Sequence, residues 1–151
     1  MKYTSTREDK ELLNFKQVTL KGLASDGGLY VPENWKQFNL KLTNTDITFE
    51  KTAYEIIKYF VGKSLDNQLL KKIISRSYKS FRNNEVTTLK QLDKNNYILE
   101  LYHGPTLAFK DIALQFLGNT FEVFLKKEKK KLTIIGATSG DTGSAAIDAV
   151  K

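Results

Sequence analysis

Apolar residues recur at helical spacing in three stretches of this 151-residue chain. In residues 49–62, 67–81 and 110–127 they fall three or four positions apart, which places them on one face of a helix. Asp66 stands directly before the second stretch and is its expected N-cap. The side chains expected to be buried are Phe49, Ala53, Ile56, Ile57, Phe60, Val61, Leu69, Leu70, Ile73, Ile74, Tyr78, Ile112, Ala113, Phe116, Leu117, Phe121 and Phe124.

Shorter apolar stretches have the lengths of strands. Residues 86–89 and 97–101 predict two strands, because branched and aromatic residues are frequent there and a polar turn separates them. Residues 132–135 form a continuous apolar run, which is typical of a buried parallel strand. A further helix is expected to begin at about residue 142 and to continue to residue 151.

The first 47 residues predict short extended pieces and turns. The strongest turn signal is Asp26-Gly27-Gly28, since glycine adopts positive φ without steric cost. Residues 29–31 are expected to form a short strand that stops at Pro32. In the last third, the order helix, strand, loop and helix indicates an α/β layer structure. Because a sheet with one clear parallel strand needs further strands, the pattern indicates a piece of a longer protein.

Composition narrows the classes of function. The chain has no cysteine and a single histidine, His103, which excludes disulfides, thiolate metal sites and a histidine-rich metal site. No apolar run is long enough to span a bilayer, and the N-terminal residues are too polar for a secretory signal peptide. We therefore expect a cytoplasmic protein with neither a metal nor a membrane partner.

The net charge of +7 does not by itself indicate a nucleic-acid partner. Only three of the 24 basic residues are arginine, the residue preferred for bidentate contacts to bases. The lysines are scattered except in residues 126–131, where they would complement the dipole at a helix C-terminus. We expect a solvated basic surface, with a nucleic-acid-binding module as the alternative.

Lys110 is the first candidate for covalent chemistry. A lysine amine is a nucleophile only in its neutral form. Lys110 stands at the expected start of helix 110–127, after the apolar residues Leu107, Ala108 and Phe109. The positive end of the helix dipole and desolvation by these neighbours both favour the neutral amine. On spacing alone, an ordinary surface lysine stays an open alternative.

The second candidate is the loop of residues 136–144, Gly-Ala-Thr-Ser-Gly-Asp-Thr-Gly-Ser. It would lie between a strand and a helix, where free amides can bind an anion and hydroxyls add further donors. It is not a P-loop, because Asp141 stands where the second glycine is required, and it lacks the dinucleotide-binding fingerprint. A helix cap without a ligand stays an alternative.

Together with two N-terminal segments, these motifs resemble threonine synthase, a pyridoxal-phosphate family of the tryptophan synthase β-like superfamily. Residues 103–111, His-Gly-Pro-Thr-Leu-Ala-Phe-Lys-Asp, are similar to its cofactor-lysine motif, and residues 138–143 to its Thr-Ser-Gly-Asp-Thr-Gly element. Residues 21–33 resemble a segment that separates the family from its relatives. Residues 3–7 resemble the family's opening, although Glu8 stands where glycine is usual.

The resemblance implies the N-terminal part of a two-domain, fold type II enzyme with pyridoxal phosphate between its domains. Residues 1–95 would be an N-terminal segment and residues 96–151 the start of the cofactor domain. Lys110, beside Phe109, would form a Schiff base with the cofactor. Asp141 would repel the cofactor's phenolic oxygen if it were ionised, so we expect it to cap the next helix or to carry a proton. The residues implied to bind the substrate carboxylate are Thr138, Ser139, Gly140, Asp141, Thr142 and Gly143.

The implied activity is that of a lyase acting on a small phosphorylated amino acid. O-phospho-L-homoserine and water would give L-threonine and phosphate by γ-elimination and β-addition of water, with Lys110 moving protons at Cα and Cβ. The family's cradle for the cofactor phosphate lies beyond residue 151, so we expect the chain alone to be inactive. A related pyridoxal-phosphate phospho-lyase and a catalytically dead homologue are alternatives. His103 is expected to be structural and Asp111 to compensate the helix dipole, and the sequence carries no signal of oligomeric state.

Overall fold

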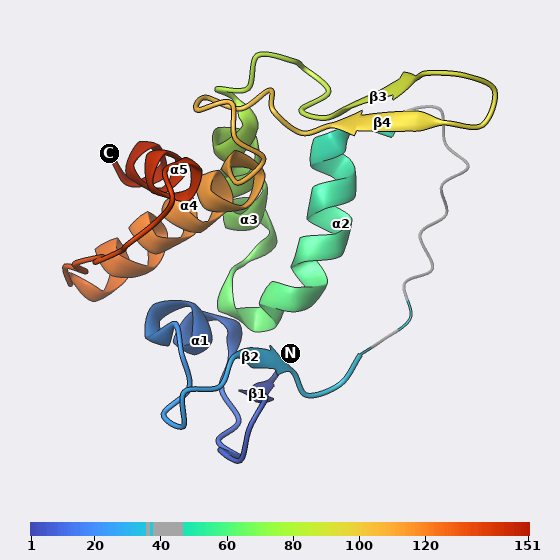
Figure 1. The fold of residues 1–151 in the computed structure, drawn as a ribbon. Coiled ribbons are helices and arrows are strands. Elements are labelled where there is room, and N and C mark those ends of the chain that lie inside the picture. Colours follow the sequence, from blue (N-terminus) through green and yellow to red (C-terminus); the bar gives the residue numbers. More distant parts are fainter. Residues whose placement is uncertain (36, 38–46) are drawn as a thin grey trace. The chain divides into compact units, whose positions relative to one another are not determined.

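The computed structural model describes residues 1–35, residue 37 and residues 47–151 (Figure 1). The chain divides into two compact units, residues 1–47 with 51–71 and residues 48–50 with 72–151. The predicted boundary at residues 95/96 refers to domains of a longer enzyme and stays a prediction. The extended pieces and turns expected at residue 36 and residues 38–46 lie outside the described residues.

The N-terminal unit contains a two-stranded antiparallel sheet. Strand β1 (Tyr3–Ser5) pairs with β2 (Tyr30–Pro32), with Tyr3 opposite Pro32 and Ser5 opposite Tyr30. The predicted strand is therefore present, shifted by one residue so that Pro32 is its last residue. The apolar cluster of this unit consists of Tyr3, Leu13 and Val18, with Met1, Phe15 and Tyr30 packed against them.

Helix α1 (Phe15–Lys21) was not predicted, because its few apolar positions are too short a run to show a helical period. Its N-terminus nevertheless carries a capping box. The Asn14 side chain accepts a hydrogen bond from the Gln17 amide at 3.0 Å, and the Gln17 side chain accepts one from the Asn14 amide at 2.9 Å. This reciprocal pair satisfies two of the amides that a helix start leaves unbonded.

The next two helices lie where they were predicted, although Val61 is the only fully buried residue of the first one. Helix α2 (Phe49–Val61) is followed by the 3₁₀ turn η1 (Gly62–Ser64) and by α3 (Asn67–Tyr78), which ends three residues before the predicted end. The carboxylate of Asp66 accepts a hydrogen bond from the Leu69 amide at 2.8 Å, which confirms Asp66 as the N-cap. In the apolar stripe of α3, the side chains of Leu70, Ile73, Ile74 and Tyr78 are buried.

In the second unit, the two predicted strands are present as β3 (Thr88–Gln91) and β4 (Tyr97–Glu100), and they pair antiparallel (Figure 1). Strand β3 begins two residues later than expected. The reason is that Val86 lies at φ 64° in a turn closed by a 2.9 Å hydrogen bond from its amide to the Asn83 carbonyl. A residue in this left-handed conformation cannot continue a strand.

Helices α4 (Asp111–Glu128) and α5 (Asp141–Val150) confirm the two helices predicted for the last third. The buried face of α4 differs from the prediction. Of the apolar residues expected there, only Phe124 is fully buried, whereas Ala113 is exposed. The buried stripe is mainly polar or small, because this face packs against α3 and α5; it comprises Asp111, Gln115, Gly118, Asn119, Thr120 and Phe124.

The strand predicted at residues 132–135 is wrong for this structure. These residues form no strand, all are exposed, and Ile135 retains 93 % of its accessible surface. A parallel strand obtains its hydrogen bonds from neighbouring strands, and no described residue supplies them here. The described helices and strands are those of an α/β protein, but they include only antiparallel strand pairs. No described helix is long and apolar enough to cross a membrane.

Candidate functional site

The loop before α4 is closed by a buried carboxylate. Asp111 is the first residue of α4 and has no exposed surface. Its Oδ2 accepts a hydrogen bond from the Thr106 amide at 2.8 Å, and its Oδ1 accepts one from the Thr106 hydroxyl at 2.7 Å. These bonds hold the loop against the start of the helix. They therefore fix the backbone position of Lys110, the residue before Asp111. Asp111 thus closes the loop in addition to standing at the positive end of the helix dipole.

Gly104 and Leu107 show how tightly this loop is folded. A Cβ added at Gly104 would overlap the Asp111 side chain, so the backbone can approach the carboxylate only where a side chain is missing. Leu107 lies at φ 63°, and its amide donates to the Gly104 carbonyl at 3.2 Å. A leucine in this left-handed conformation costs about 1–3 kcal/mol. The Asp111 hydrogen bonds hold the loop in spite of that cost.

Lys110 presents its amine at the surface of this loop. The side chain is partly exposed, and its Nζ lies 4.2 Å from the centroid of the Phe109 ring. Among the described residues, no carboxylate forms an ion pair with Lys110. Phe109 itself keeps 58 % of its surface exposed. The amine is therefore accessible to a ligand and lies against an exposed aromatic ring.

The predicted anion loop is organised by Thr138. Its hydroxyl oxygen accepts hydrogen bonds from the amides of Gly143 at 3.0 Å and Gly140 at 3.3 Å, and so caps the start of α5. Gly140 lies at φ 130°, a conformation that favours glycine. The expected cap at Asp141 is thus supplied by Thr138, whereas Asp141 is an exposed first-turn residue. The amides of Asp141 and Thr142 have no acceptor among the described residues, and they can bind an anion.

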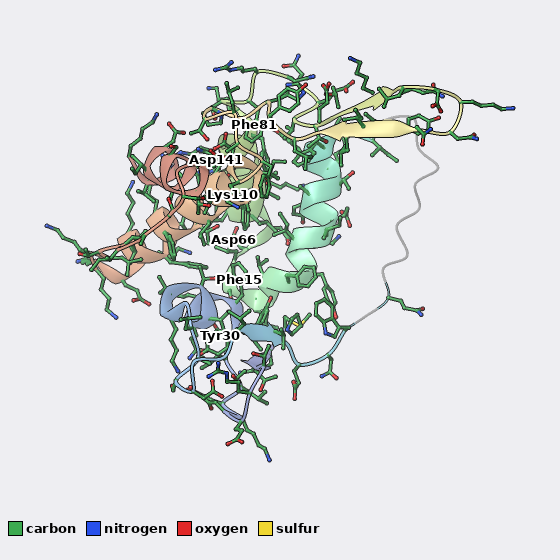
Figure 2. The ribbon with its side chains drawn as sticks, in the orientation of Figure 1. Phe15, Tyr30, Asp66, Phe81, Lys110 and Asp141 are labelled. Atoms are coloured by element: carbon green, nitrogen blue, oxygen red, sulfur yellow. The ribbon has the colours of Figure 1, made fainter. Side chains whose placement is uncertain are left out.

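The lysine and the anion loop meet at one hollow. An open, largely apolar cavity of about 500 Å³ includes both Lys110 and Thr142 in its wall. Figure 2 labels Lys110 and Asp141, the residue before Thr142. Phe109 also lines it, whereas Thr138, Ser139, Gly140, Asp141 and Gly143 lie outside its wall. The complete lining is Leu101, Phe109, Lys110, Ile112, Ala113, Leu114 and Thr142.

Four residues of this lining were not recognised as site residues in the sequence. Ile112 and Ala113 were assigned to the core, Leu101 was assigned to the end of a strand, and Leu114 received no role. Ala113 and Leu114 follow Lys110 by three and four positions, which places them on the same face of α4. That spacing is the signal that could have identified them.

His103 has a structural role, in agreement with the expectation. Its Nε2 lies 2.8 Å from the Thr88 hydroxyl and 3.2 Å from Glu100 Oε2, and its carbonyl accepts a hydrogen bond from the Arg82 amide at 2.8 Å. The hydroxyls of Tyr102 and then Thr88 donate to Glu100 and hold the pKa of that carboxyl below its ordinary value. His103 therefore joins the β3–β4 hairpin to the lysine loop, and it does not line the hollow.

The two N-terminal motifs fold onto one another around Asp26. The Ser5 hydroxyl donates to the Asp26 carboxylate at 2.8 Å, and the Arg7 guanidinium donates to the Asp26 carbonyl at 2.8 Å. Hydrogen bonds from main-chain amides, chiefly that of Asp9, lower the pKa of Asp26 to about 2. The amides that donate to this carboxylate belong to Glu8, Asp9 and Gly28.

This arrangement accounts for the unusual residue at position 8. Glu8 contributes its amide, which lies 3.0 Å from Asp26 Oδ2, and its side chain is exposed. The contact requires a backbone N–H and is independent of the side chain, so glutamate can stand where the resemblance leads one to expect glycine. The segment of residues 3–7 thus has a structural role and lies outside the lysine hollow.

Residues 2–78 match the family described as threonine synthase N terminus. Threonine synthase from Pseudomonas aeruginosa is 47 % identical over 150 residues, which cover 98 % of this chain and 32 % of that protein. The crystal structure of pyridoxal-phosphate-bound threonine synthase from Brucella melitensis superimposes with a TM-score of 0.93 at 40 % identity, over 99 % of this chain and 33 % of that one. The yeast threonine synthase structure has a TM-score of 0.91 at 44 % identity, over the same shares of the two chains.

The chain thus spans about a third of the length of the relatives that it matches. The family match covers the Asp26 network and the first three helices, and the relatives extend the similarity over the lysine loop and the anion loop. The resemblance inferred from the motifs is confirmed, and the chain belongs to the threonine synthase family.

Proposed function

We propose that this chain forms the N-terminal third of a pyridoxal-phosphate-dependent threonine synthase, with Lys110 as the residue that binds the cofactor. In this proposal the enzyme is a carbon–oxygen lyase that acts on phosphates and converts O-phospho-L-homoserine and water to L-threonine and phosphate. The observation that supports it most strongly is the shared hollow, which brings Lys110 and Thr142 together although they are far apart in the sequence.

The residues of the hollow fit pyridoxal phosphate. An aldehyde requires a primary amine that it can reach, and the Lys110 side chain is partly exposed and free of ion pairs among the described residues. A flat aromatic ring requires apolar surface, which Phe109, Leu101 and Ile112 provide. The volume of about 500 Å³ is ordinary for a small-molecule site. Bound pyridoxal phosphate would supply an electron sink for negative charge that develops on the substrate carbons.

Lys110 would have two roles in turn. It would hold the cofactor covalently through Nζ, and as a free amine it would serve as a general base and acid. In the neutral form, Nζ would accept a proton from substrate Cα, and the resulting ammonium would return a proton to a substrate carbon. The Asp111 hydrogen bonds to Thr106 fix the backbone from which this side chain extends.

The start of α5 would bind the substrate carboxylate. The amides of Asp141 and Thr142, which have no acceptor among the described residues, are the donors that an anion needs at a helix N-terminus. Thr138, whose oxygen accepts from Gly140 and Gly143, keeps its own O–H available as a further donor. In this proposal, Ser139 and Gly140 complete the loop.

The direct test is to offer three substrates to the enzyme that contains this chain, loaded with pyridoxal phosphate. O-phospho-L-homoserine, O-phospho-L-threonine and L-threonine are incubated separately, and threonine, phosphate and keto acid are measured. We expect threonine and phosphate in equal amounts from O-phosphohomoserine. Phosphate and keto acid from O-phosphothreonine alone would favour a different phospho-lyase, and turnover of none would indicate a catalytically dead homologue.

The 151-residue chain by itself is the matched control. We expect it to form no threonine, because the residues described here supply the lysine and an anion loop but no cradle for the cofactor phosphate. Threonine formation by the isolated chain would show that these 151 residues are sufficient for the reaction and would contradict this expectation.

A further inference from the structure

Helices α4 and α5 cross at a very short distance, and Gly118 makes this possible. A Cβ added at Gly118 would overlap the carbonyl oxygen of Ala149 and would lie 2.8 Å from its carbonyl carbon. The obstacle is main chain, which cannot move aside as the end of a flexible side chain can. Gly118 is fully buried in the middle of α4, where glycine is less favourable than alanine by about 1 kcal/mol. Its presence here is explained by the crossing.

One turn nearer the start of α4, a hydrogen bond fixes the same crossing. The buried Gln115 donates from Nε2 to Asp148 Oδ2 at 2.7 Å. The other side of this helix face is held by α3, because Asn119 donates from Nδ2 to the Ser77 hydroxyl at 3.2 Å. Helix α4 is thus held between two neighbours by polar contacts that require a specific register.

The contacts between α4 and α5 occur in the same order along both helices. Starting at the hollow, where Lys110 and Thr142 lie, the pairs are Gln115 with Asp148 and then Gly118 with Ala149. At 1.5 Å per residue, the Gly118 crossing lies about 10 Å along the axis from the start of α4. A shift or tilt imposed at the crossing is therefore carried by a rigid helix to the start of α5.

We propose that Gly118, Gln115 and Asp148 are positioning residues, which set the register of α5 on α4 and thereby hold Thr142 at the hollow of Lys110. This inference rests on the proposed function for the part that concerns catalysis. None of the three residues lines the hollow. They act on the distance between the lysine and the anion loop, the two parts that would engage the α-carbon and the carboxylate of one substrate.

The first variant is Gly118→Ala, which adds one methyl group at the crossing. Alanine favours the isolated helix, so a loss of function cannot be attributed to weaker helix formation. We expect kcat/KM for O-phosphohomoserine to fall by about 10- to 100-fold, in line with the effect of misplacing a catalytic part by about 1 Å. Most of the loss should appear in KM, because the loop that binds the substrate is displaced while Lys110 keeps its place. Lys127→Ala, at an exposed position of the same helix, is the control and should leave kcat/KM unchanged.

The second pair of variants tests the hydrogen bond without adding volume at the crossing. Asp148→Ala removes the acceptor of Gln115, whereas Asp148→Asn keeps a carbonyl oxygen that can accept. We expect Asp148→Ala to raise KM and Asp148→Asn to restore it. Asp148 also pairs with Lys151, so Lys151→Ala, which should have no effect, separates the two contacts. If Gly118→Ala fails to fold, the Asp148 pair decides the question alone.

A proximity measurement provides a readout that does not depend on turnover. Residues 1–151 contain no cysteine, so Leu114→Cys and Thr142→Cys create one pair of thiols in the wall of the hollow once any cysteines elsewhere in the enzyme are replaced by serine. The rate of cross-linking by a short bifunctional thiol reagent then reports the distance between α4 and the start of α5. We expect Gly118→Ala and Asp148→Ala to slow this reaction at least about fivefold, comparable to the lower end of measured coupling effects.

The outcomes separate this inference from the proposed function. Cross-linking as fast in Gly118→Ala and Asp148→Ala as in the parent pair would overturn the register claim. Slower cross-linking with unchanged kcat/KM would overturn its link to catalysis. If the enzyme without these substitutions turns over no O-phosphohomoserine, the proposed function fails, while the cross-linking result still decides the register claim.

Discussion

Two polar, glycine-containing loops of this chain use their hydrogen-bond donors in opposite ways. At residues 26–28, the Asp26 carboxylate is surrounded by donors from the same unit, and each of its oxygens accepts at least two hydrogen bonds. At residues 138–143, one hydroxyl caps the helix and two neighbouring amides have no acceptor among the described residues. In the first loop the hydrogen-bond donors are used within the chain, whereas the second loop has amides available to a ligand.

The difference separates folding motifs from binding motifs. A network in which every group is paired stabilises one conformation and has nothing left to offer a ligand. Amides left open at a helix start, beside an accessible amine and an apolar hollow, provide the parts that an anionic substrate needs. Both loops resemble family motifs in sequence, and the hydrogen bonds distinguish their roles.

The largest expected effect is at Lys110. Lys110→Ala in the complete enzyme should reduce threonine formation by at least about 10²- to 10⁴-fold, because it removes a general acid–base group as well as the covalent attachment. Lys94→Ala, in the exposed turn between β3 and β4, is the control and should retain activity. Rates are measured at saturating substrate and cofactor. Retained activity in Lys110→Ala would show that Lys110 is not needed for the reaction. It would then contradict the interpretation of the loop at residues 138–143 as the binding loop beside a catalytic lysine.

A pair of glycine substitutions compares the two loops directly. Gly104→Ala would place a Cβ against the buried Asp111 carboxylate, and Gly28→Ala would place one against Ser5 and 2.9 Å from Asp26 Oδ1. Each should lower the free energy of unfolding by about 1–3 kcal/mol, the usual cost of overpacking. Urea unfolding measures this cost.

The two glycine variants should differ in their chemistry. Only Gly104→Ala disturbs the loop that positions Lys110, so only this variant should slow the reaction of Lys110 with pyridoxal phosphate. Equal slowing by Gly28→Ala would show that the Asp26 network also shapes the site.

A smaller effect is expected at Thr138. Thr138→Val removes the oxygen that caps α5 and should cost about 0.5–2 kcal/mol, the range for loss of a helix cap. Thr138→Ser keeps the hydroxyl and should recover most of this loss. Thermal unfolding of the three proteins gives the comparison. No difference between valine and serine would indicate that the cap is not formed in solution.

The smallest effect is confined to acid solution. Main-chain amides lower the pKa of Asp26 to about 2 in the folded chain, from an ordinary value of 3.8. A carboxyl with a lowered pKa contributes stability that is fully present above its unfolded value. That stability is lost as the pH falls from about 4 towards 2. In Asp26→Asn this part of the pH dependence should be absent, so the melting temperatures of the two proteins should converge below pH 3. A constant difference down to pH 2 would contradict the lowered pKa.

Helices were predictable where the apolar period was long. The bounds of α2, α4 and α5 follow the sequence to within one residue or two, and Asp66 was identified as a cap from its place before the period. Helix α1 was missed because a seven-residue helix shows too little period, although Asn14 and Gln17 have the spacing of a capping box.

Features that depend on contacts with other segments of the fold were not predictable from the sequence. The run at residues 132–135 is apolar enough for a buried strand, but its hydrogen bonds require neighbours that no described residue provides. The polar buried face of α4 was missed because Gln115 and Gly118 are buried by close helix packing, which apolar periodicity does not reveal.

The site shows the same limit. Lys110 and the anion loop were found from their motifs, because each motif is local in sequence. They meet at one hollow because α4 packs on α5. The same packing explains why Thr142 is the one residue of the anion loop that lines the hollow. The hydrogen bonds of Asp111 to Thr106 were not predictable either, because sequence spacing does not show that a loop folds back on itself.

The most direct test of the account is to identify the amine that pyridoxal phosphate modifies. The enzyme that contains this chain is loaded with the cofactor and reduced with borohydride, and its peptides are mapped by mass spectrometry. We expect a phosphopyridoxyl group on Lys110, and we expect it to be absent when O-phosphohomoserine occupies the site during reduction. A stoichiometric label on any other lysine, with Lys110 unmodified, would contradict it.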